Sequence, residues 1–229
     1  ANQRDLDTAL SLGISHQSTD GVPTLRSSAV DSGYQNTSFN IAGSQAVQGA
    51  TLEASHWQTQ GSSDYSNTLL LPLSQDFVTS VTSLSIAGQW LSNLDSRLQL
   101  SLARDHIDQN DSSDFSHTDR TTLAWRNVAT LAQNDKFTLG AETVWEKANY
   151  LSYGIYQYQG TTHSQALYGQ YDLNRGQHQA LAGGRLLHHQ DAGDHVTWNL
   201  GYGYQLTSAT RLKSNLSTGF RYPTSTERF

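Results

Sequence analysis

The most regular feature of the sequence is an alternation of apolar and polar residues with a period of two. Between residues 97 and 104, for example, three leucines alternate with polar or small side chains. This period is typical of a strand with one apolar face, and no segment shows a convincing helical period. The pattern predicts eleven strands, near residues 6–16, 37–44, 50–58, 79–91, 97–105, 119–131, 136–146, 162–173, 178–188, 195–206 and 211–221.

The predicted connections alternate between short and long. Short turns rich in Asn, Asp and Gly are expected near residues 45–49, 92–96, 132–135, 174–177 and 207–210. Longer polar loops are expected near 17–36, 59–78, 106–118, 147–161 and 189–194. The predicted fold class is therefore all-β, an antiparallel up-and-down meander. Short turns at one end and long loops at the other are also typical of transmembrane β-barrels.

Two environments suit such strands. In a soluble sandwich the apolar face points into a dry core, whereas in a membrane barrel it points to lipid and the polar face lines a wet lumen. Several strands are long enough to meet the roughly 9–11 residues that cross a bilayer. Aromatic residues lie at both strand ends on the apolar face, which favours the barrel: Trp145 and Trp198 near the loops, and Trp90, Tyr171 and Tyr204 near the turns. Trp57 alone among the tryptophans has the polar parity.

Composition agrees with this interpretation. Charged residues make up 15% of the 229 residues, against about 25% in an average soluble domain. The net charge is -6 and no basic run occurs, which argues against a nucleic-acid partner. The sequence has no cysteine, so disulfides and thiolate chemistry are excluded. No apolar stretch approaches the roughly 18 residues of a membrane helix.

The C-terminal stretch, residues 198–229, resembles a recurring segment of TonB-dependent outer-membrane receptors. Two strands lead into a signature that reads Gly219-Phe220-Arg221-Tyr222-Pro223-Thr224-Ser225-Thr226-Glu227-Arg228-Phe229. Tyr222 replaces a usual small residue and Arg228 a usual Leu. Residues 10–22, 32–41, 50–66, 136–148 and 163–173 are similar to barrel strands of the cobalamin-receptor branch of this family.

This resemblance implies a transmembrane barrel of 22 strands with a plug domain, of which residues 1–229 form one partial barrel domain without the plug. It implies a location in the outer membrane of a Gram-negative bacterium, in contact with outer-membrane lipid. It further implies TonB-dependent uptake of a corrinoid or a ferric siderophore, with the TonB energy-coupling complex engaged through a missing N-terminal region. The resemblance therefore indicates a transporter and not an enzyme.

Aromatic side chains in the long loops are the candidate ligand-binding residues, because exposed rings suit contact with a flat ligand. Histidines beside carboxylates in residues 188–195 offer possible ligands for a ferric chelate or zinc. An alternative interpretation has Tyr156 and Tyr158 extending the interfacial aromatic belt. The predicted ligand-binding residues are Tyr34, Tyr65, Tyr150, Tyr153, Tyr156, Tyr158, His188 and His189.

The family resemblance also implies a possible calcium site, the only cofactor expected. Its candidate ligands are Asp20, Asp31 and Asp64, although six to eight oxygens are needed and the early loops hold few carboxylates. Solvated loop aspartates are the simpler interpretation. A second acidic segment, 106–118, could bind a cation, and three lumen-facing cations could guide an anionic chelate or pair with plug carboxylates: Arg211, Lys213 and Arg221.

Three classes of function remain open from the residues alone. The receptor is expected first, because of the resemblance. An outer-membrane barrel enzyme, a protease or lipase, is the second class, but no catalytic constellation lies at matching strand ends. A simple channel or a soluble β-sandwich binder is the third. No phosphate loop, nucleophile elbow or zinc-protease motif occurs in the sequence.

Overall fold

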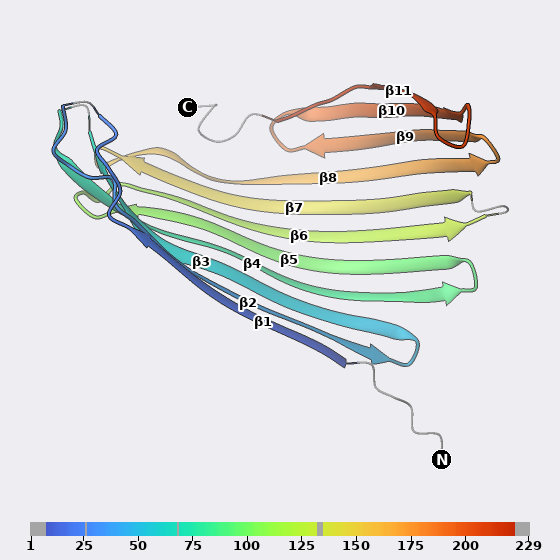
Figure 1. Cartoon of the computed structure of the whole chain (residues 1–229), viewed down its shortest axis with the longest axis horizontal. Helices are drawn as coiled ribbons and strands as arrows, with labels where there is room; N and C mark the ends of the chain where they lie inside the picture. Colours follow the sequence, from blue (N-terminus) through green and yellow to red (C-terminus); the bar gives the residue numbers. More distant parts are fainter. Residues whose placement is uncertain (1–7, 26, 68, 132–134, 223–229) are drawn as a thin grey trace, which may run out of the picture.

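A computed structural model describes residues 8–25, 27–67, 69–131 and 135–222. Within these residues eleven strands form one antiparallel sheet, in which each strand pairs with its neighbours in sequence (Figure 1). All eleven predicted strands are present, and in the predicted order. They are β1 (Thr8–Thr19), β2 (Tyr34–Val47), β3 (Ala50–Ser66), β4 (Pro72–Leu91), β5 (Leu94–Gln109), β6 (Phe115–Thr130), β7 (Lys136–Ser152), β8 (Ile155–Arg175), β9 (His178–His189), β10 (Gly193–Gln205) and β11 (Arg211–Ser217).

The register of the sheet places apolar and polar side chains on opposite faces. Leu84, Leu100 and Leu123 lie directly opposite one another on β4, β5 and β6. Their chain neighbours Ser85 and Ser101 point to the other face, because side chains alternate along a strand. On β9 and β10 the polar-face residues are regularly the less exposed ones. The sheet therefore curves with its polar face concave and its apolar face convex.

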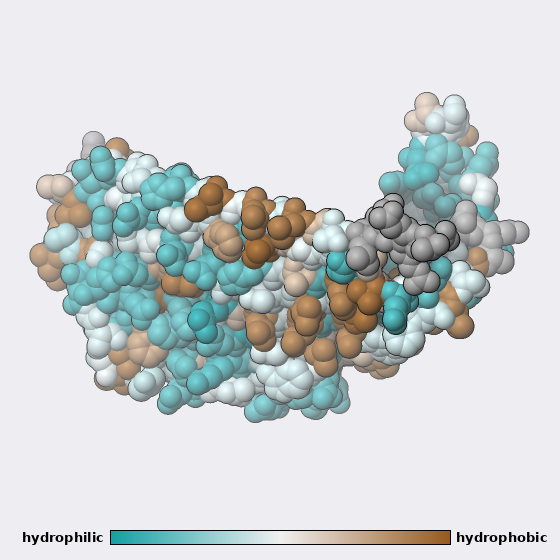
Figure 2. Space-filling model, turned by 90° about the horizontal axis from the view of Figure 1, so that it is seen from below, coloured by the Kyte–Doolittle hydropathy of each residue, from teal (hydrophilic) through white to brown (hydrophobic). Residues whose placement is uncertain are grey.

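This sheet has no dry core of large apolar residues. The buried apolar residues of the described chain are Val144, Ala148 and Ala166, all on the concave face, while Ile14 on the convex face is 79% exposed. Hydrophobic side chains gather toward the middle of the strands, and hydrophilic ones dominate the long-loop end, on the left (Figure 2). The sandwich alternative is thus wrong. No helix in the described residues is long and apolar enough to cross a membrane.

Most strands continue much further than the sequence pattern predicted. β4 has 20 residues and β8 has 21, about twice what a tilted strand needs to cross a bilayer. The surplus lies at the long-loop end, where the predicted loops 59–78, 106–118 and 147–161 shrink to residues 67–71, 110–114 and 153–154. β9 and β10 are shorter, and their hairpin ends well before this rim (Figure 1).

The C-terminal segment departs from the prediction in the opposite direction. β11 ends at Ser217, not near residue 221. After it, Thr218 accepts and donates hydrogen bonds with the backbone of Trp198, and the ring of Phe220 stacks on His195 at 3.4 Å. Residues 223–229 of the receptor signature lie outside the described residues.

Candidate functional site

Aromatic side chains gather on the concave face near the long-loop end. Tyr34 opens β2 and pairs with Ser63 of β3, which in turn pairs with Gln75 of β4. Its ring stacks on that of Phe77, with centroids 5.8 Å apart and planes inclined by 13°. The two rings come from strands that are not adjacent, so they cover the backbone of β3 between them.

A cleft of about 480 Å³ opens beside these rings, between the loops 67–71, 110–114 and 153–154. Tyr65 lies in it and donates a hydrogen bond to the side chain of Gln109. Partial burial, with a smaller effect of the carboxylates of Asp111 and Asp114, raises the pKa of the Tyr65 phenol. The phenol therefore stays protonated, available as a donor, well above neutral pH.

Tyr150 and Tyr158 lie opposite each other on β7 and β8, on the concave face. A bulge follows, in which Gln157 is the extra residue, and Tyr156 consequently lies on the convex face. There Tyr156 packs edge-on against Phe115, with centroids 6.1 Å apart. The bulge thus separates two tyrosines that have the same sequence parity.

The hairpin between β7 and β8 ends in a two-residue turn, Tyr153 and Gly154, with φ values of 53° and 70°. Positive φ at both positions is typical of the tight turns that fit the twist of a β-hairpin. Tyr153 is 92% exposed at this tip. The Gly154 N–H donates to Asp114 across the cleft, at 3.2 Å, which ties the two loop tips together.

Deeper in the concave face, charged side chains are paired. Arg97 contacts Glu53 at 2.6 Å, and Arg185 contacts Glu142 at 2.8 Å while lying over the ring of Tyr168. Such pairs neutralise charge along the trough below the aromatic cleft. Arg126 also lies on this face, opposite Arg97, so the trough is polar and carries charged side chains.

The two histidines of the predicted ligand set lie on opposite faces. His188 is on the convex face, paired with Asp194 at 2.6 Å. His189 is buried on the concave face, where Tyr222 stacks on it at 3.7 Å and its ring accepts from the backbone N–H of Asp191. Residues 188–195 therefore do not present their ligating groups to one point.

The prediction that these residues lie in loops is wrong for most of them. The strands include seven of the predicted ligand-binding residues and one predicted calcium ligand, and only Tyr153 is in a turn. Their role in binding a ligand stays a prediction. The strand residues concerned are Tyr34, Tyr65, Tyr150, Tyr156, Tyr158, His188, His189 and Asp64.

The predicted calcium ligands lie near one another only in part. Asp20 follows β1, and its carbonyl oxygen and the carboxylate of Asp64 both border Gly33. Asp31 is an exposed residue of the same loop. In the described part of the chain no three or more His, Asp or Glu side chains are arranged to hold a metal ion. The calcium site remains a prediction.

The acidic segment 106–118 is divided: His106, Asp108 and His117 lie on the convex face, whereas Asp111 and Asp114 line the cleft. His117 contacts Asp108 at 2.9 Å, His106 contacts Asp119 at 3.3 Å, and the two imidazoles stack at 4.1 Å. The carboxylates of Asp108 and Asp119 contact histidines and do not face the cleft. Of the three predicted lumen cations, Arg211 and Lys213 lie on the concave face opposite Gln205 and Gly203.

Two residues at this end of the concave face, Phe77 beside Tyr34 and Gln109 in the cleft, are not among the site residues that the sequence predicts. Phe77 was assigned to a loop, and Gln109 was not singled out. Continuing the period of two from the predicted strands would have placed both on the concave face, since Phe77 shares parity with Ser83 and Gln109 with Gln99. The period of two continues through this region, but apolar and polar residues do not alternate there, so the sequence pattern does not reveal the strands.

Comparison with known proteins agrees with this architecture. Residues 2–229 match the family model described as TonB dependent receptor-like, beta-barrel. No curated protein sequence matches the chain. A mutant of the ferric enterobactin receptor PfeA from Pseudomonas aeruginosa has a similar structure, with a TM-score of 0.68 and 15% identity, covering 91% of this chain. At that identity the likeness shows the fold, and the chain spans 38% of that receptor's length.

The family match covers nearly the whole chain and agrees with the eleven-stranded sheet, its apolar convex face and its polar concave face. The family consists of transport receptors and not of enzymes, so the enzyme alternative has no support. The cobalamin-receptor branch is not shown by these comparisons. The chain belongs to the TonB-dependent receptor-like β-barrel family and forms part of a barrel in the outer membrane of a Gram-negative bacterium.

Proposed function

We propose that this chain is part of a receptor that binds a corrinoid at the long-loop end of its concave face and imports it with energy from the TonB complex. Family membership supports the uptake role and the TonB partner. The ligand class is argued from the cleft, and the single observation that carries it is the set of aromatic side chains on the concave face.

Five of these side chains come from five different strands yet share one face and one end of the sheet. Tyr34 stacks on Phe77, Tyr65 borders the cleft, and Tyr150 and Tyr158 pair across β7 and β8. Aromatic faces contribute large apolar contact, and phenols add hydrogen bonds at the edge. A flat ligand with polar substituents at its rim suits this surface.

The charge of the cleft favours an uncharged ligand. Its lining includes Asp111 and Asp114 but, among the described residues, no Lys or Arg. Below the cleft on the concave face, Arg120 contacts Glu146 at 3.7 Å. Because like charges repel in a partly desolvated site, this surface suits an amide-bearing corrinoid better than a highly anionic ferric chelate.

A ferric siderophore is the second candidate, supported by the likeness to a ferric enterobactin receptor. A calcium ion held by Asp20, Asp31 and Asp64 is part of the proposal, since a cation there would link residues between β1 and β2 to Asp64 of β3. Binding of cyanocobalamin and of ferric enterobactin to the intact receptor, each measured with and without calcium, distinguishes the two ligand classes and tests the calcium site.

We expect Tyr65→Ala and Tyr150→Ala, made in the intact receptor, each to raise the Kd for cyanocobalamin about tenfold, because each removes about 1.4 kcal/mol of ring contact. The matched control is Tyr156→Ala, which removes a ring on the convex face. Isothermal titration calorimetry in detergent measures the three affinities.

Unchanged affinity in both concave-face variants would show that the aromatic cleft is not the ligand site. Tighter binding of ferric enterobactin than of cyanocobalamin would replace the corrinoid with the second candidate. Uptake by cells should also stop when TonB is deleted, and uptake that persists would contradict the energy coupling.

A further inference from the structure

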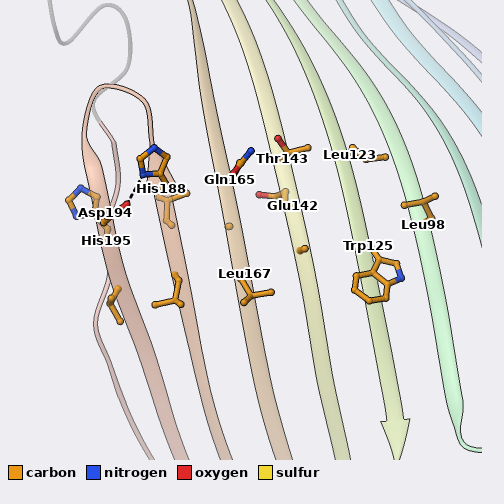
Figure 3. Close-up of a pocket in the computed structure, with 15 residues that line it drawn as sticks. Leu98, Leu123, Trp125, Glu142, Thr143, Gln165, Leu167, His188, Asp194 and His195 are labelled. Carbon is orange, nitrogen blue, oxygen red and sulfur yellow. Dashed lines mark hydrogen bonds and ion pairs between the residues drawn. The ribbon is translucent and has the colours of Figure 1, made fainter.

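A second hollow, of about 680 Å³, lies on the opposite, convex face across β5 to β10 (Figure 3). Its floor is a continuous row of paired residues that crosses six strands. Ala141 is the smallest member of this row, and it lies between Trp125 on β6 and Leu167 on β8. The missing side-chain volume at Ala141 hollows the surface. The row consists of Leu98, Trp125, Ala141, Leu167, Leu186 and Val196.

The next row toward the long loops is polar over four adjacent strands. Thr143, Gln165, His188 and Asp194 lie opposite one another there, on the same face. His188 and Asp194 are hydrogen-bonded at 2.6 Å, and Thr143 hydrogen bonds to His163 at 2.8 Å. Figure 3 shows these polar side chains toward the hairpin end, with Trp125 and Leu167 further down the strands. The hollow thus has an apolar body and a polar end.

We propose that this hollow, here called the convex groove, binds one glycolipid of the outer leaflet. Its acyl chain lies along the apolar row, and the amide and hydroxyl groups at the base of its head meet Thr143, Gln165, His188 and Asp194. The convex face of an outer-membrane barrel contacts lipid, and long loops mark the outer side. The polar row therefore lies at the level of the outer-leaflet headgroups.

Specific binding requires more than apolar contact here. Lipid tails are as apolar as leucine, so a groove in hydrocarbon is selective through close packing and hydrogen bonds. Ala141 provides the space for packing, and the polar row provides donors and acceptors. Contact with lipid tails alone does not require polar side chains at the same height on four adjacent strands.

The chemistry of the polar row selects the head. It presents a hydroxyl, an amide, an imidazole and a carboxylate, and no Lys or Arg occurs among the described residues that line the groove. This set matches hydroxyl and amide groups. Glucosamine-based glycolipids carry amide-linked, hydroxylated acyl chains at this boundary, whereas phosphatidylglycerol has no amide group there.

The test uses the intact receptor, purified and incubated with lipid A or with phosphatidylglycerol, and native mass spectrometry measures the lipid retained. We expect the unmodified receptor to retain one lipid A. Ala141→Phe fills the groove and should lower lipid A retention at least about tenfold, the effect of losing about two methylene contacts. The control is Ala182→Phe, at a small convex-face residue on β9 outside the groove.

A second variant tests recognition of the lipid headgroup. Gln165→Leu should lower the retention of lipid A while leaving that of phosphatidylglycerol unchanged. Equal losses in Ala141→Phe and Ala182→Phe, or equal retention of both lipids by the unmodified receptor, would overturn the proposal. Unchanged electrophoretic mobility of the unheated barrel shows that each variant is folded, and corrinoid binding at the other face is expected to be the same in all of them.

Discussion

At the scale of single residues, Asp135 is the most enclosed side chain of the described chain. Its carboxylate is 1% exposed and lies at the short turn before β7. It accepts hydrogen bonds from Arg175 at 2.7 Å, from the Asn174 N–H at 3.1 Å and from the Tyr171 hydroxyl at 2.9 Å. The Arg175 guanidinium, above all, holds the pKa of this carboxyl below its usual range. Asp135 therefore fastens the start of β7 to the end of β8.

We expect Asp135→Asn to lower the urea concentration at which the intact barrel unfolds, because Arg175 loses its charged partner. A carboxyl with a depressed folded pKa contributes stability above its unfolded pKa of about 4, and loses it as the pH falls through the lower folded value. The difference between the variant and the unmodified receptor should therefore be full at pH 7 and shrink below about pH 4.

Urea titrations followed by tryptophan fluorescence at a series of pH values measure this difference. Asp95→Asn, at an exposed aspartate beside another short turn, is the control and should have little effect at any pH. A difference that stays constant from pH 7 down to pH 3 would mean that the charge of Asp135 does not stabilise the turn.

At the scale of strands, the sequence predicts the strand segments that face lipid but not their extensions beyond the apolar band. The period of two is clear where one face meets hydrocarbon, as at Leu98, Leu100 and Leu102, and there the predicted strands coincide with the observed ones. Beyond the apolar band both faces meet water, so polar residues such as Gln58 and Gln60 occupy the convex positions. The alternation disappears although the backbone pairing continues, so the sequence predicts loops where the strands in fact extend.

The candidate site was predictable in residue type but not in placement. Tyr65 and Tyr150 are predicted because aromatic rings in the long loops suit contact with a flat ligand, and strand register brings both to the cleft. Tyr156 and Tyr158 have the same parity in the sequence, and only the bulge at Gln157 separates their faces. A bulge depends on pairing with the neighbouring strand, which a period in one strand does not contain.

Strand pairing itself can be tested at Gly61 in β3. A Cβ atom there would lie 1.9 Å from the backbone oxygen of Gln35 on β2. Backbone cannot move aside as a flexible side chain can, so Gly61→Ala should force the two strands apart at a cost of about 1–3 kcal/mol. Gly184→Ala is the control, since its Cβ atom would have no neighbour closer than 3.9 Å.

Hydrogen exchange of the backbone amides reports the result strand by strand. In Gly61→Ala, amides of residues 34–37 and 60–63 should exchange faster, while those around residue 184 stay protected. Equal protection of β2 and β3 in both proteins would show that the close approach at Gly61 is not required for their pairing.

At the scale of the whole molecule, the sheet is a strip of barrel wall with two different edges. β1 and β11 lie at its ends, each with one side unpaired in the described chain. Unpaired backbone groups are costly in hydrocarbon, so both edges need further strands to close the barrel. The wall is also uneven in height, since β2 to β8 rise above the level at which the β9–β10 hairpin ends (Figure 1). The aromatic cleft lies at the tall side.

The orientation of the two faces underlies every conclusion about this molecule, and two adjacent residues test it. Leu100 lies midway along β5 on the convex face, and Ser101 points to the concave face. We expect Leu100→Arg to destabilise the intact barrel by about 2–4 kcal/mol, because it places a charge in the middle of the bilayer, whereas Ser101→Arg stays hydrated in the lumen and costs far less. Folding titrations into lipid vesicles measure both values. A larger cost for Ser101→Arg than for Leu100→Arg would mean that the concave face meets lipid and the convex face meets water. The aromatic cleft would then face lipid and the convex groove would face water.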